Sequence, residues 1–582
     1  MHDLVIRGAW VVDGSGAPAR TADVAVDGDR IEAVGRVPER GRREIDAAGA
    51  WVLPGFVDVH THYDGQATWD PELAPSAWHG VTTAIFGNCS VGFAPVRPGS
   101  EPFLIQLMEG VEDIPGSALA EGIPFGWETF PEYLDALEAL PHAFDLGAQV
   151  PHAALRFYVM GDRGADHGAR PTPEEVARMG ALAVEACRAG AFGFTTSRTR
   201  KHRAADGRPT PSLSADEDEL VGIARALGRA GRGVLQLNSD FETPEEWELL
   251  RAMVEASGRP LSFSLIQVDH APERWRELLR RVGEARAAGL RVTAQVASRP
   301  IGVLVGLGVT FHPFLGCPTW ESLADLPLAE RARRLRADPA LRARLLQEEP
   351  DPFGRWQRAI LDRVFELGDP PDYEPPPEAS ITTRARRAGR EPLELALERL
   401  LERDGAALLY HPFENYSAGD CEAIREMLAS PHTVSALSDG GAHVATLCDA
   451  SFPTTLLTHW ARDRRRGEKL PLELLVHKQT RATAELVGLL DRGLLAPGYR
   501  ADLNVVDPTT LNALPPELRH DLPAGGRRLV QGARGILHTF VGGVETFREG
   551  EATGALPGRL LRGPTPPPPG AARTGAGGTP GR

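Results

Sequence analysis

Two histidines separated by a single residue are the first candidates for chemistry in this sequence. His60 and His62 end residues 55–62 (GFVDVHTH), whose apolar residues predict a buried strand. Alternate residues of a strand face the same side, so the two imidazoles project together. Two neutral imidazoles at this separation can chelate one divalent ion. We therefore predict a metal site at the C-terminal end of this strand.

Cys89 and Asp439 follow two other strand-like segments, at 81–88 and 434–437. A Cys89 thiolate could coordinate zinc, although a lone cysteine is often a small buried apolar residue. The Asp439 carboxylate could ligate a metal and take a proton from water, or it could instead form a turn beside Gly440. Position alone leaves both alternatives open for each residue.

The segments that must position these residues alternate between strands and helices. Helices with capping boxes begin at 172–175 and 243–246. About eight β–α units predict an α/β fold, a (β/α)8 TIM barrel, whose active sites lie at the C-terminal ends of the strands. A doubly wound open sheet is the alternative, but no Gly-x-Gly-x-x-Gly turn follows an early strand. The strand-like segments lie at 56–62, 81–88, 146–150, 192–196, 233–238, 261–266, 291–295 and 434–437.

The two ends of the chain have a different texture. Short apolar runs separated by turn signals such as Asp27-Gly28 occupy residues 1–53, and similar runs return near 501–541. We expect a small β-sandwich domain formed from both chain ends (1–54 and 485–562) beside a catalytic barrel (55–484). Residues 300–405 are rich in Leu, Arg and Glu and predict a helical insertion. The proline- and glycine-rich tail, 563–582, is expected to be disordered.

Composition narrows the functional classes. Hydrophobic residues make up 42% of the chain and charged residues 25%, the balance of a soluble globular protein. The net charge of −15 argues against a general nucleic-acid binder. We expect a small-molecule substrate as the partner, on the family resemblance given below. The five cysteines are scattered and no segment reaches the roughly 18 apolar residues of a membrane span. We expect a cytoplasmic protein without a membrane anchor, whose oligomeric state the sequence leaves open.

Three motifs together resemble a known superfamily. Residues 55–62, the Ser-Asp-Gly-Gly at 438–441 and residues 495–503 (LAPGYRADL) are similar to the amidohydrolase superfamily. Residues 87–90 (GNCS), followed by Phe-Ala-Pro at 93–95, are similar to the N-acyl-D-amino-acid deacylases, or D-aminoacylases, within it. The resemblance covers residue 3 to about 562 and implies a zinc-dependent hydrolase of amide C–N bonds with a TIM barrel and a small β-sandwich. It also implies that His60, His62 and Cys89 bind metal and that Asp439 is the catalytic aspartate and a further ligand.

The chain departs from that subgroup at positions that bind metal and substrate. The resemblance implies a metal-binding histidine after the fifth strand, where we place Gln236, and another on the sixth strand, where Leu265 stands. A substrate-facing lysine is replaced by Gln267. We therefore expect one ion per chain, with a second uncertain. Lys201 and five histidines could in principle supply replacement ligands, although each is more typical of a loop or supporting position: His152, His202, His312, His411 and His443.

Three functions fit these residues. The first is a zinc hydrolase of an acyl–amine bond, in which the metal polarises the carbonyl and Asp439 moves the proton. The second is a hydrolase of another linear or cyclic amide, and the third is a non-catalytic binding protein that has kept the barrel. Arg198 and Arg299 are candidates for gripping a substrate carboxylate in a bidentate fork, with Gln267 as a third substrate-binding residue; either arginine could equally form a salt bridge on a loop.

Overall fold

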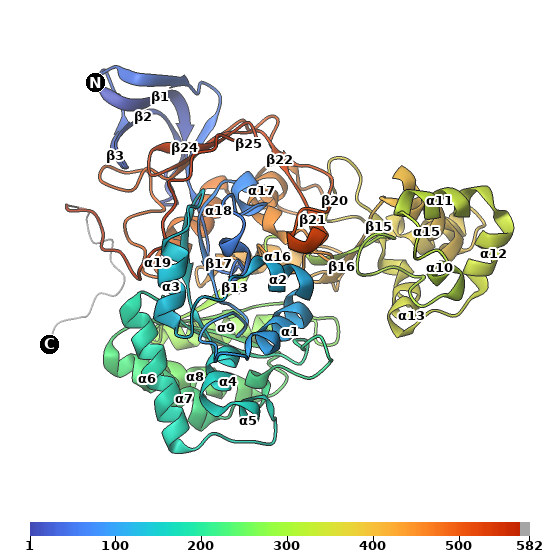
Figure 1. Cartoon of the computed structure of the whole chain (residues 1–582). Coiled ribbons are helices and arrows are strands. Elements are labelled where there is room, and N and C mark those ends of the chain that lie inside the picture. The colour runs from blue at the N-terminus through green and yellow to red at the C-terminus, as the bar shows by residue number, and fades with distance from the viewer. Residues whose placement is uncertain (571–582) are drawn as a thin grey trace.

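Two parallel sheets form the middle of the molecule in the computed structural model, which describes residues 1–570 (Figure 1). Backbone hydrogen bonds join the sheets at both junctions: Phe192 N donates to Ala148 O (2.8 Å) and His62 N donates to Gly440 O (2.7 Å). The first sheet contains β6 (Phe56–Asp58), β7 (Val81–Phe86) and β8 (Asp145–Ala148). The second contains β9 (Val150–Pro151), β10 (Gly193–Arg198), β11 (Val234–Ser239), β12 (Leu261–Ser264), β13 (Val292–Val296) and β17 (Thr433–Ser435).

Helices follow these strands and pack against them. Every residue of β7 is buried, as expected for a parallel strand covered on both faces. The two predicted capping boxes are confirmed, because Thr172 and Glu175 satisfy each other's backbone N–H groups at the start of α6, as do Thr243 and Glu246 before α8. The helices of this region are α6 (Pro173–Ala189), α7 (Glu217–Ala230), α8 (Pro244–Ser257) and α9 (Arg274–Ala287).

A nine-stranded sheet is formed from both chain ends. Strand β5 (Trp51–Pro54) pairs with β1 (His2–Val11) on one side and with β18 (Leu503–Val506) on the other, so it joins the N-terminal and C-terminal strands. The sheet branches at β1, whose first half also pairs with β4 (Gly41–Asp46). The remaining strands are β2 (Arg20–Asp27), β3 (Arg30–Gly35), β23 (Ile536–Val541), β24 (Val544–Arg548) and β25 (Glu551–Ala552).

The long segment between β13 and β17 forms a helical lobe on one side of the molecule (Figure 1, yellow-green). It has its own apolar core, which includes Phe314, Leu335 and Leu397. The prediction of helices alone was incomplete, because β14 (Ile301–Val305) and β15 (Phe365–Glu366) pair antiparallel with β16 (Leu409–Glu414). A five-residue apolar run does not distinguish strand from helix by periodicity. The helices are α10 (Pro318–Glu321), α11 (Leu328–Ala337), α12 (Pro339–Gln347), α13 (Pro352–Ala359), α14 (Ile381–Arg387) and α15 (Pro392–Leu400).

The C-terminal segment leaves the nine-stranded sheet and runs along β8, a strand of the first parallel sheet. Leu146 N donates to Arg559 O (2.9 Å), and Leu561 N donates to Leu146 O (2.7 Å). The predicted disorder of residues 563–582 is wrong for 563–570, because Thr565 exchanges backbone hydrogen bonds with Gly488 and Leu490 and Pro568 is buried. Proline is compatible with an extended segment of this kind, in which the residues beside it supply the backbone hydrogen bonds. Residues 571–582 lie outside the described part of the chain.

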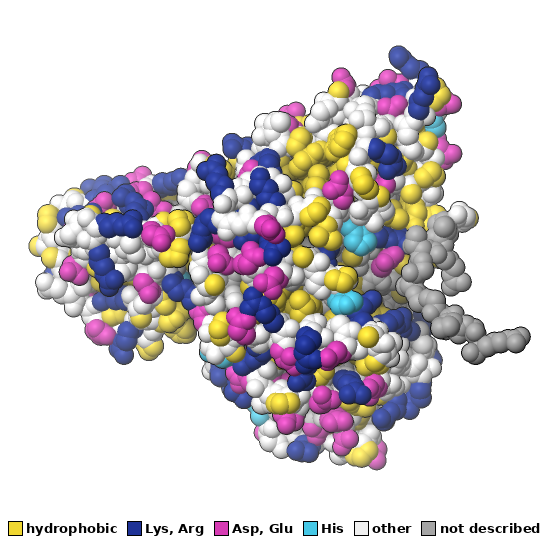
Figure 2. Space-filling view, turned by 180° about the vertical axis from the view of Figure 1, so that it is seen from behind, with side chains coloured by type: hydrophobic (Ala, Val, Ile, Leu, Met, Phe, Trp, Pro, Cys, Tyr) yellow, Lys and Arg dark blue, Asp and Glu magenta, His cyan; other side chains and the backbone are white. Residues whose placement is uncertain are grey.

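The remaining elements connect these units. Figure 2 shows acidic and basic side chains interspersed over the visible face. Within residues 1–570, none of the helices has both the length and the apolar composition needed to cross a membrane. The elements not yet given are α1 (Glu101–Glu112), α2 (Gly116–Gly122), α3 (Phe130–Glu138), α4 (His152–Met160), α5 (Asp162–Ala165), α16 (Glu422–Ala429), α17 (Phe452–Thr455), α18 (Leu472–Gln479), α19 (Arg481–Leu486), β19 (Asn512–Ala513), β20 (Glu517–Arg519), β21 (Arg528–Val530) and β22 (Ala533–Arg534).

Candidate metal centre

Four side chains that the sequence singles out converge at the ends of β6, β7 and β17. His60 Nε2 lies 3.3 Å from Cys89 Sγ and 3.4 Å from Asp439 Oδ1, and His62 Nε2 lies 3.8 Å from the same Asp439 oxygen. The donor atoms of His60, His62 and Cys89 all lie within 4.8 Å of one another. Ligands about 2.0–2.3 Å from one zinc ion have separations of this order.

Backbone contacts fix the loops that carry these residues. Asp439 N donates to His60 O (3.2 Å), which ties the end of β17 to the end of β6. The Asp58 carboxylate accepts a hydrogen bond from His60 N (3.2 Å) and another from Ser438 Oγ. Cys89 and Asp439 both have left-handed backbone conformations, with φ of 53° and 48°. Such strain in non-glycine residues persists where the surrounding structure enforces it, and it is frequent at functional sites.

A hydrogen bond decides which nitrogen of His60 faces the cluster. His60 Nδ1 lies 2.7 Å from Gln295 Oε1, and Gln295 Nε2 donates to Ser262 Oγ (2.9 Å). With the amide oriented in this way, Nδ1 of His60 carries the proton. The lone pair on Nε2 is then directed toward Cys89 and Asp439, which is the arrangement of a histidine that binds metal.

The β11 residue that contacts Cys89 is an asparagine, Asn238, and not a histidine. Asn238 Nδ2 donates to Cys89 Sγ (2.9 Å), and Asn238 Oδ1 accepts a hydrogen bond from Ser264 Oγ. The sequence analysis placed the missing fifth-strand histidine at Gln236, whereas the β11 side chain that contacts Cys89 is that of Asn238. Gln236 precedes Asn238 by two residues, so it faces the same side but lies earlier along the strand. Leu265 is fully buried and offers no ligand atom.

The electrostatics of the cluster favour a bound cation. Burial raises the pKa of Asp439 well above its usual value, and nearby Asp449 adds to this effect. Burial, with nearby Glu112, also raises the pKa of the Cys89 thiol, and it lowers the pKa of His60 to about 4. Both ring nitrogens of His62 are buried without a hydrogen-bond partner in the described chain. No lysine or arginine among residues 1–570 forms an ion pair with these four side chains, so the donor set fits a divalent ion.

The sequence analysis missed Glu112, the last residue of α1. Its side chain is only 1% exposed, with Oε1 3.4 Å from His62 Nδ1 and Oε2 3.4 Å from His443 Nε2. A glutamate at a helix end ordinarily faces solvent, and no local pattern distinguishes this one. Among the histidines considered as replacement ligands, His443 is therefore linked to His62 by the Glu112 carboxylate, which lies between them.

The other candidate replacements have different partners. His202 Nδ1 is hydrogen-bonded to Ser197 Oγ (3.0 Å), and burial, together with His443 and Lys201, lowers the pKa of His202 to about 3. Lys201 pairs with Glu414. The remaining three histidines are hydrogen-bonded within the protein: His152 to Glu219, His312 to Phe314 N and His411 to Arg363 O.

Gln267 and Arg299, predicted to bind substrate, form contacts within the protein. Gln267 Nε2 donates to Pro272 O (3.1 Å), and its Oε1 accepts from Ser417 N (3.2 Å). Arg299 is 2% exposed, and its guanidinium lies 3.6 Å from the centre of the Tyr373 ring. Arg198 donates to the carbonyl of Ala215 and is not brought to the cluster. The Nη1 and Nη2 groups of Arg299 donate to Ser451, Thr455, Cys448 O and Asp449.

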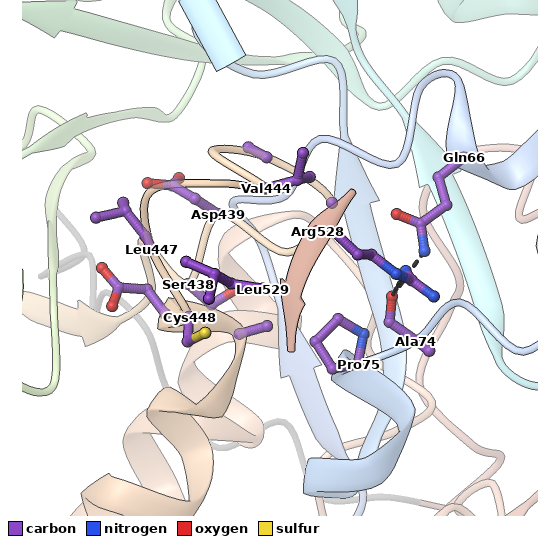
Figure 3. Close-up of a pocket in the computed structure, with 14 residues that line it drawn as sticks. Gln66, Ala74, Pro75, Ser438, Asp439, Val444, Leu447, Cys448, Arg528 and Leu529 are labelled. Carbon is purple, nitrogen blue, oxygen red and sulfur yellow. Dashed lines mark hydrogen bonds between the residues drawn. The ribbon is translucent and has the colours of Figure 1, made fainter. Parts of the chain in front are cut away.

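Strands β20 and β21 from the C-terminal part of the chain cover the loop that carries Asp439. Figure 3 shows Arg528 beside Gln66 and Ala74, where Arg528 Nη1 donates to Ala74 O (3.0 Å). Leu529 N donates to Val444 O on the same loop. The cavity between these segments and Asp439 measures about 20 Å³, enough for about one water molecule.

Comparison with known proteins identifies the family. Residues 43–547 match the amidohydrolase family. This chain belongs to that family. The amidohydrolase is 30% identical to a D-aminoacylase of Alcaligenes xylosoxydans xylosoxydans over 570 residues, which cover 96% of this chain and 97% of the relative.

Solved structures show the same likeness. The amidohydrolase superposes with a TM-score of 0.63 on a crystal structure of D-aminoacylase, at 26% identity and with 97% and 100% of the two chains covered. It superposes with a TM-score of 0.62 on the N-acyl-D-glutamate deacylase of Bordetella bronchiseptica complexed with zinc and a phosphonate inhibitor, at 25% identity and 96% and 99% coverage. The chain is therefore a hydrolase of C–N bonds other than peptide bonds.

Proposed function

We propose that this amidohydrolase is a zinc-dependent deacylase of N-acyl amines, related in chemistry to the D-aminoacylases. The observation that carries the proposal is the position of His60 Nε2, which lies 3.3 Å from Cys89 Sγ and 3.4 Å from Asp439 Oδ1, with His62 beside them. The named relatives act on N-acyl-D-amino acids, and one of them is complexed with zinc. Shared family membership supports the same reaction class in this chain.

We also propose that the two parallel sheets close into a (β/α)8 barrel of residues 55–484. Hydrogen bonds at both junctions between the sheets support this interpretation. The nine-stranded sheet then corresponds to the β-sandwich domain (1–54 and 485–562), since a sheet that branches at one strand can fold into two layers. The metal cluster lies at the C-terminal ends of the barrel strands, where barrel enzymes keep their active sites.

The proposed cofactor is one metal ion per chain, with His60, His62, Cys89 and Asp439 as its ligands. A bound zinc ion supplies Lewis-acid polarisation of an amide carbonyl. Asp439 accepts the proton of the attacking water and returns it to the leaving nitrogen. Gln295 holds His60 in the tautomer that presents Nε2 to the cluster. Asn238 donates a hydrogen bond to Cys89 and thereby favours its thiolate form.

The substrate is proposed to depend little on an anionic group. Arg198 and Arg299, the predicted carboxylate-binding residues, donate to Ala215 O and to Asp449, and Gln267 uses its amide within the protein. A charge-assisted hydrogen bond to a carboxylate contributes roughly 1.5–3 kcal/mol, so its loss weakens binding of a simple N-acyl amino acid. An amide without a carboxylate is therefore the second candidate substrate class for the same site.

The test is a hydrolysis screen with the zinc-loaded protein. Matched pairs would include N-acetyl-D-leucine, its L isomer and the corresponding amides that lack the carboxylate. We expect turnover of at least one N-acyl amine, greater activity on the neutral members and loss of activity after chelation. A protein that binds zinc but hydrolyses no member of a broad amide panel would contradict the enzymatic proposal and favour a non-catalytic binding protein.

A further inference from the structure

Glu112 is a buried carboxylate for which the deacylase reaction as proposed has no role. Neither carboxylate oxygen of Glu112 has a hydrogen-bond partner among residues 1–570, although the side chain is only 1% exposed to solvent. No lysine or arginine among residues 1–570 pairs with it; its near neighbours are the two imidazoles of His62 and His443, each 3.4 Å away. An unpaired carboxylate in such an environment is costly unless a nearby group donates to it.

The backbone around Glu112 is held rigidly against the loop that follows Asp439. His443 N donates to Glu112 O, so the end of α1 is joined to this loop directly. The next residue, Asp113, has a left-handed conformation (φ 52°), and its carboxylate accepts hydrogen bonds from Thr310 and Thr446. The position of the Glu112 carboxylate is therefore set by three segments that are far apart in the sequence.

The two edges of the His62 ring face different groups. Nδ1 is directed at Glu112, whereas Nε2 is directed at Asp439. Glu112 consequently lies on the side of His62 opposite to the metal cluster and is not a ligand of the same ion. A carboxylate in this position accepts the Nδ1 proton, fixes the tautomer and orients Nε2 toward a metal.

We propose that Glu112 is a positioning residue of the metal centre, which accepts hydrogen bonds from His62 Nδ1 and His443 Nε2. This inference rests on the proposed metal site. His60 provides the internal comparison, because its Nδ1 has a neutral amide acceptor, Gln295, 2.7 Å away. The two metal-facing histidines therefore have different acceptors, one amide and one carboxylate. His443, whose side chain is 27% exposed, is held by Glu112 at the open side of the cluster.

Zinc affinity measured by chelator competition tests this role. Loss of an outer acceptor of this kind typically lowers metal affinity about 10–100-fold. We expect that loss for Glu112→Ala and a smaller loss for Glu112→Gln, which keeps an acceptor oxygen. Glu101→Gln is the matched control, since it makes the same chemical change at the other end of α1, and it should bind zinc as the wild type does. The fold of each variant would be checked by circular dichroism and thermal unfolding without metal.

The tautomer gives a readout that a merely structural role would not change. In zinc-loaded protein labelled with ¹⁵N-histidine, the Nδ1–H signal of His62 should be present in the wild type and lost or broadened in Glu112→Ala, while the His60 signal remains. A Glu112→Ala protein with wild-type zinc affinity and an unchanged His62 signal would overturn the inference alone. A wild-type protein that binds no zinc would overturn the proposed function as well.

Discussion

Asp439 is the residue on which the proposed chemistry depends most directly. Its carboxylate lies 3.4 Å from His60 and 3.8 Å from His62, on a loop with enforced left-handed backbone conformations. We expect Asp439→Asn to keep the fold and to lower the rate of hydrolysis by about 10²–10⁴, because an amide cannot accept the proton. Steady-state kinetics on a substrate validated in the screen would measure this. A rate within a few-fold of the wild type would mean that another group is the base.

The number of bound ions follows from the residues around Cys89. The family resemblance implies ligands for a second ion on the fifth and sixth strands, where this chain has Asn238 beside Cys89 and the buried Leu265, and neither side chain is a good zinc ligand. Elemental analysis after gel filtration should give about one zinc per chain. We expect the double variant Asn238→His/Leu265→His to hold a second ion, because both positions are then imidazoles. Two tightly held ions in the wild type would contradict the single-site arrangement.

Only part of this site could be predicted from the sequence. His60, His62, Cys89 and Asp439 each follow a strand-like segment, and the geometry of parallel strands brings such residues to one end. Glu112 comes from a helix end, and nothing in its local sequence distinguishes it from an exposed glutamate. Gln236 and Asn238 lie on the same side of β11, two residues apart, so the alternation of the predicted strand could not decide which of them lies beside Cys89.

At the scale of elements, Arg299 shows why a charged residue near a strand end need not bind substrate. It follows β13, as a substrate-binding arginine would, but Asp449 and the rings of Tyr373 and Phe452 surround it. These partners come from a loop and a helix more than 70 residues away in the sequence. The strands themselves were predictable because of their apolar runs, whereas contacts between such distant segments have no local signal.

A second buried ion pair joins the helical lobe to the rest of the chain and makes stability depend on pH. Although burial acts to raise it, hydrogen bonds from His459 and Arg464 lower the pKa of Glu374 to about 2. In the unfolded chain this group titrates near 4.5. The ionised carboxylate therefore stabilises the fold above about pH 4.5, and this contribution is lost as the pH falls toward 2.

We expect Glu374→Gln to unfold at a lower temperature than the wild type at pH 7. The difference should shrink as the pH falls below about 4.5, because the wild-type carboxyl then takes up a proton and resembles the amide. Thermal unfolding followed by circular dichroism between pH 7 and 3.5 would measure it. Glu378→Gln, an exposed neighbour without an ion pair in the described chain, is the control and should show no such pH dependence. A constant difference across this pH range would contradict the assignment.

At the scale of the whole molecule, the C-terminal segment pairs with the central strand β8. Besides its pairing with Leu146, Arg559 N donates to the Asp145 carboxylate (2.9 Å), and Arg562 binds Asp135 and Glu138 of α3. A chain that ends at residue 555 leaves the buried polar groups of Asp145 and Leu146 without these partners, which is costly. We expect it to be less soluble or to unfold at a clearly lower temperature than a chain that ends at residue 570. Equal solubility and unfolding temperature would show that the segment adds little.

The pairing of β8 with the C-terminal segment also implies a delay during synthesis, because β8 is made long before its partner. Asp145 and its partner Arg559 are 414 positions apart. At roughly 5–20 residues per second, the ribosome needs about 20–80 s to make the residues between them. Throughout that interval the backbone groups of Leu146 on β8 lack their C-terminal partners, and an unpaired strand edge is a template for association with other chains. Translation that stops before residue 559 therefore yields a chain in which this part of β8 stays open.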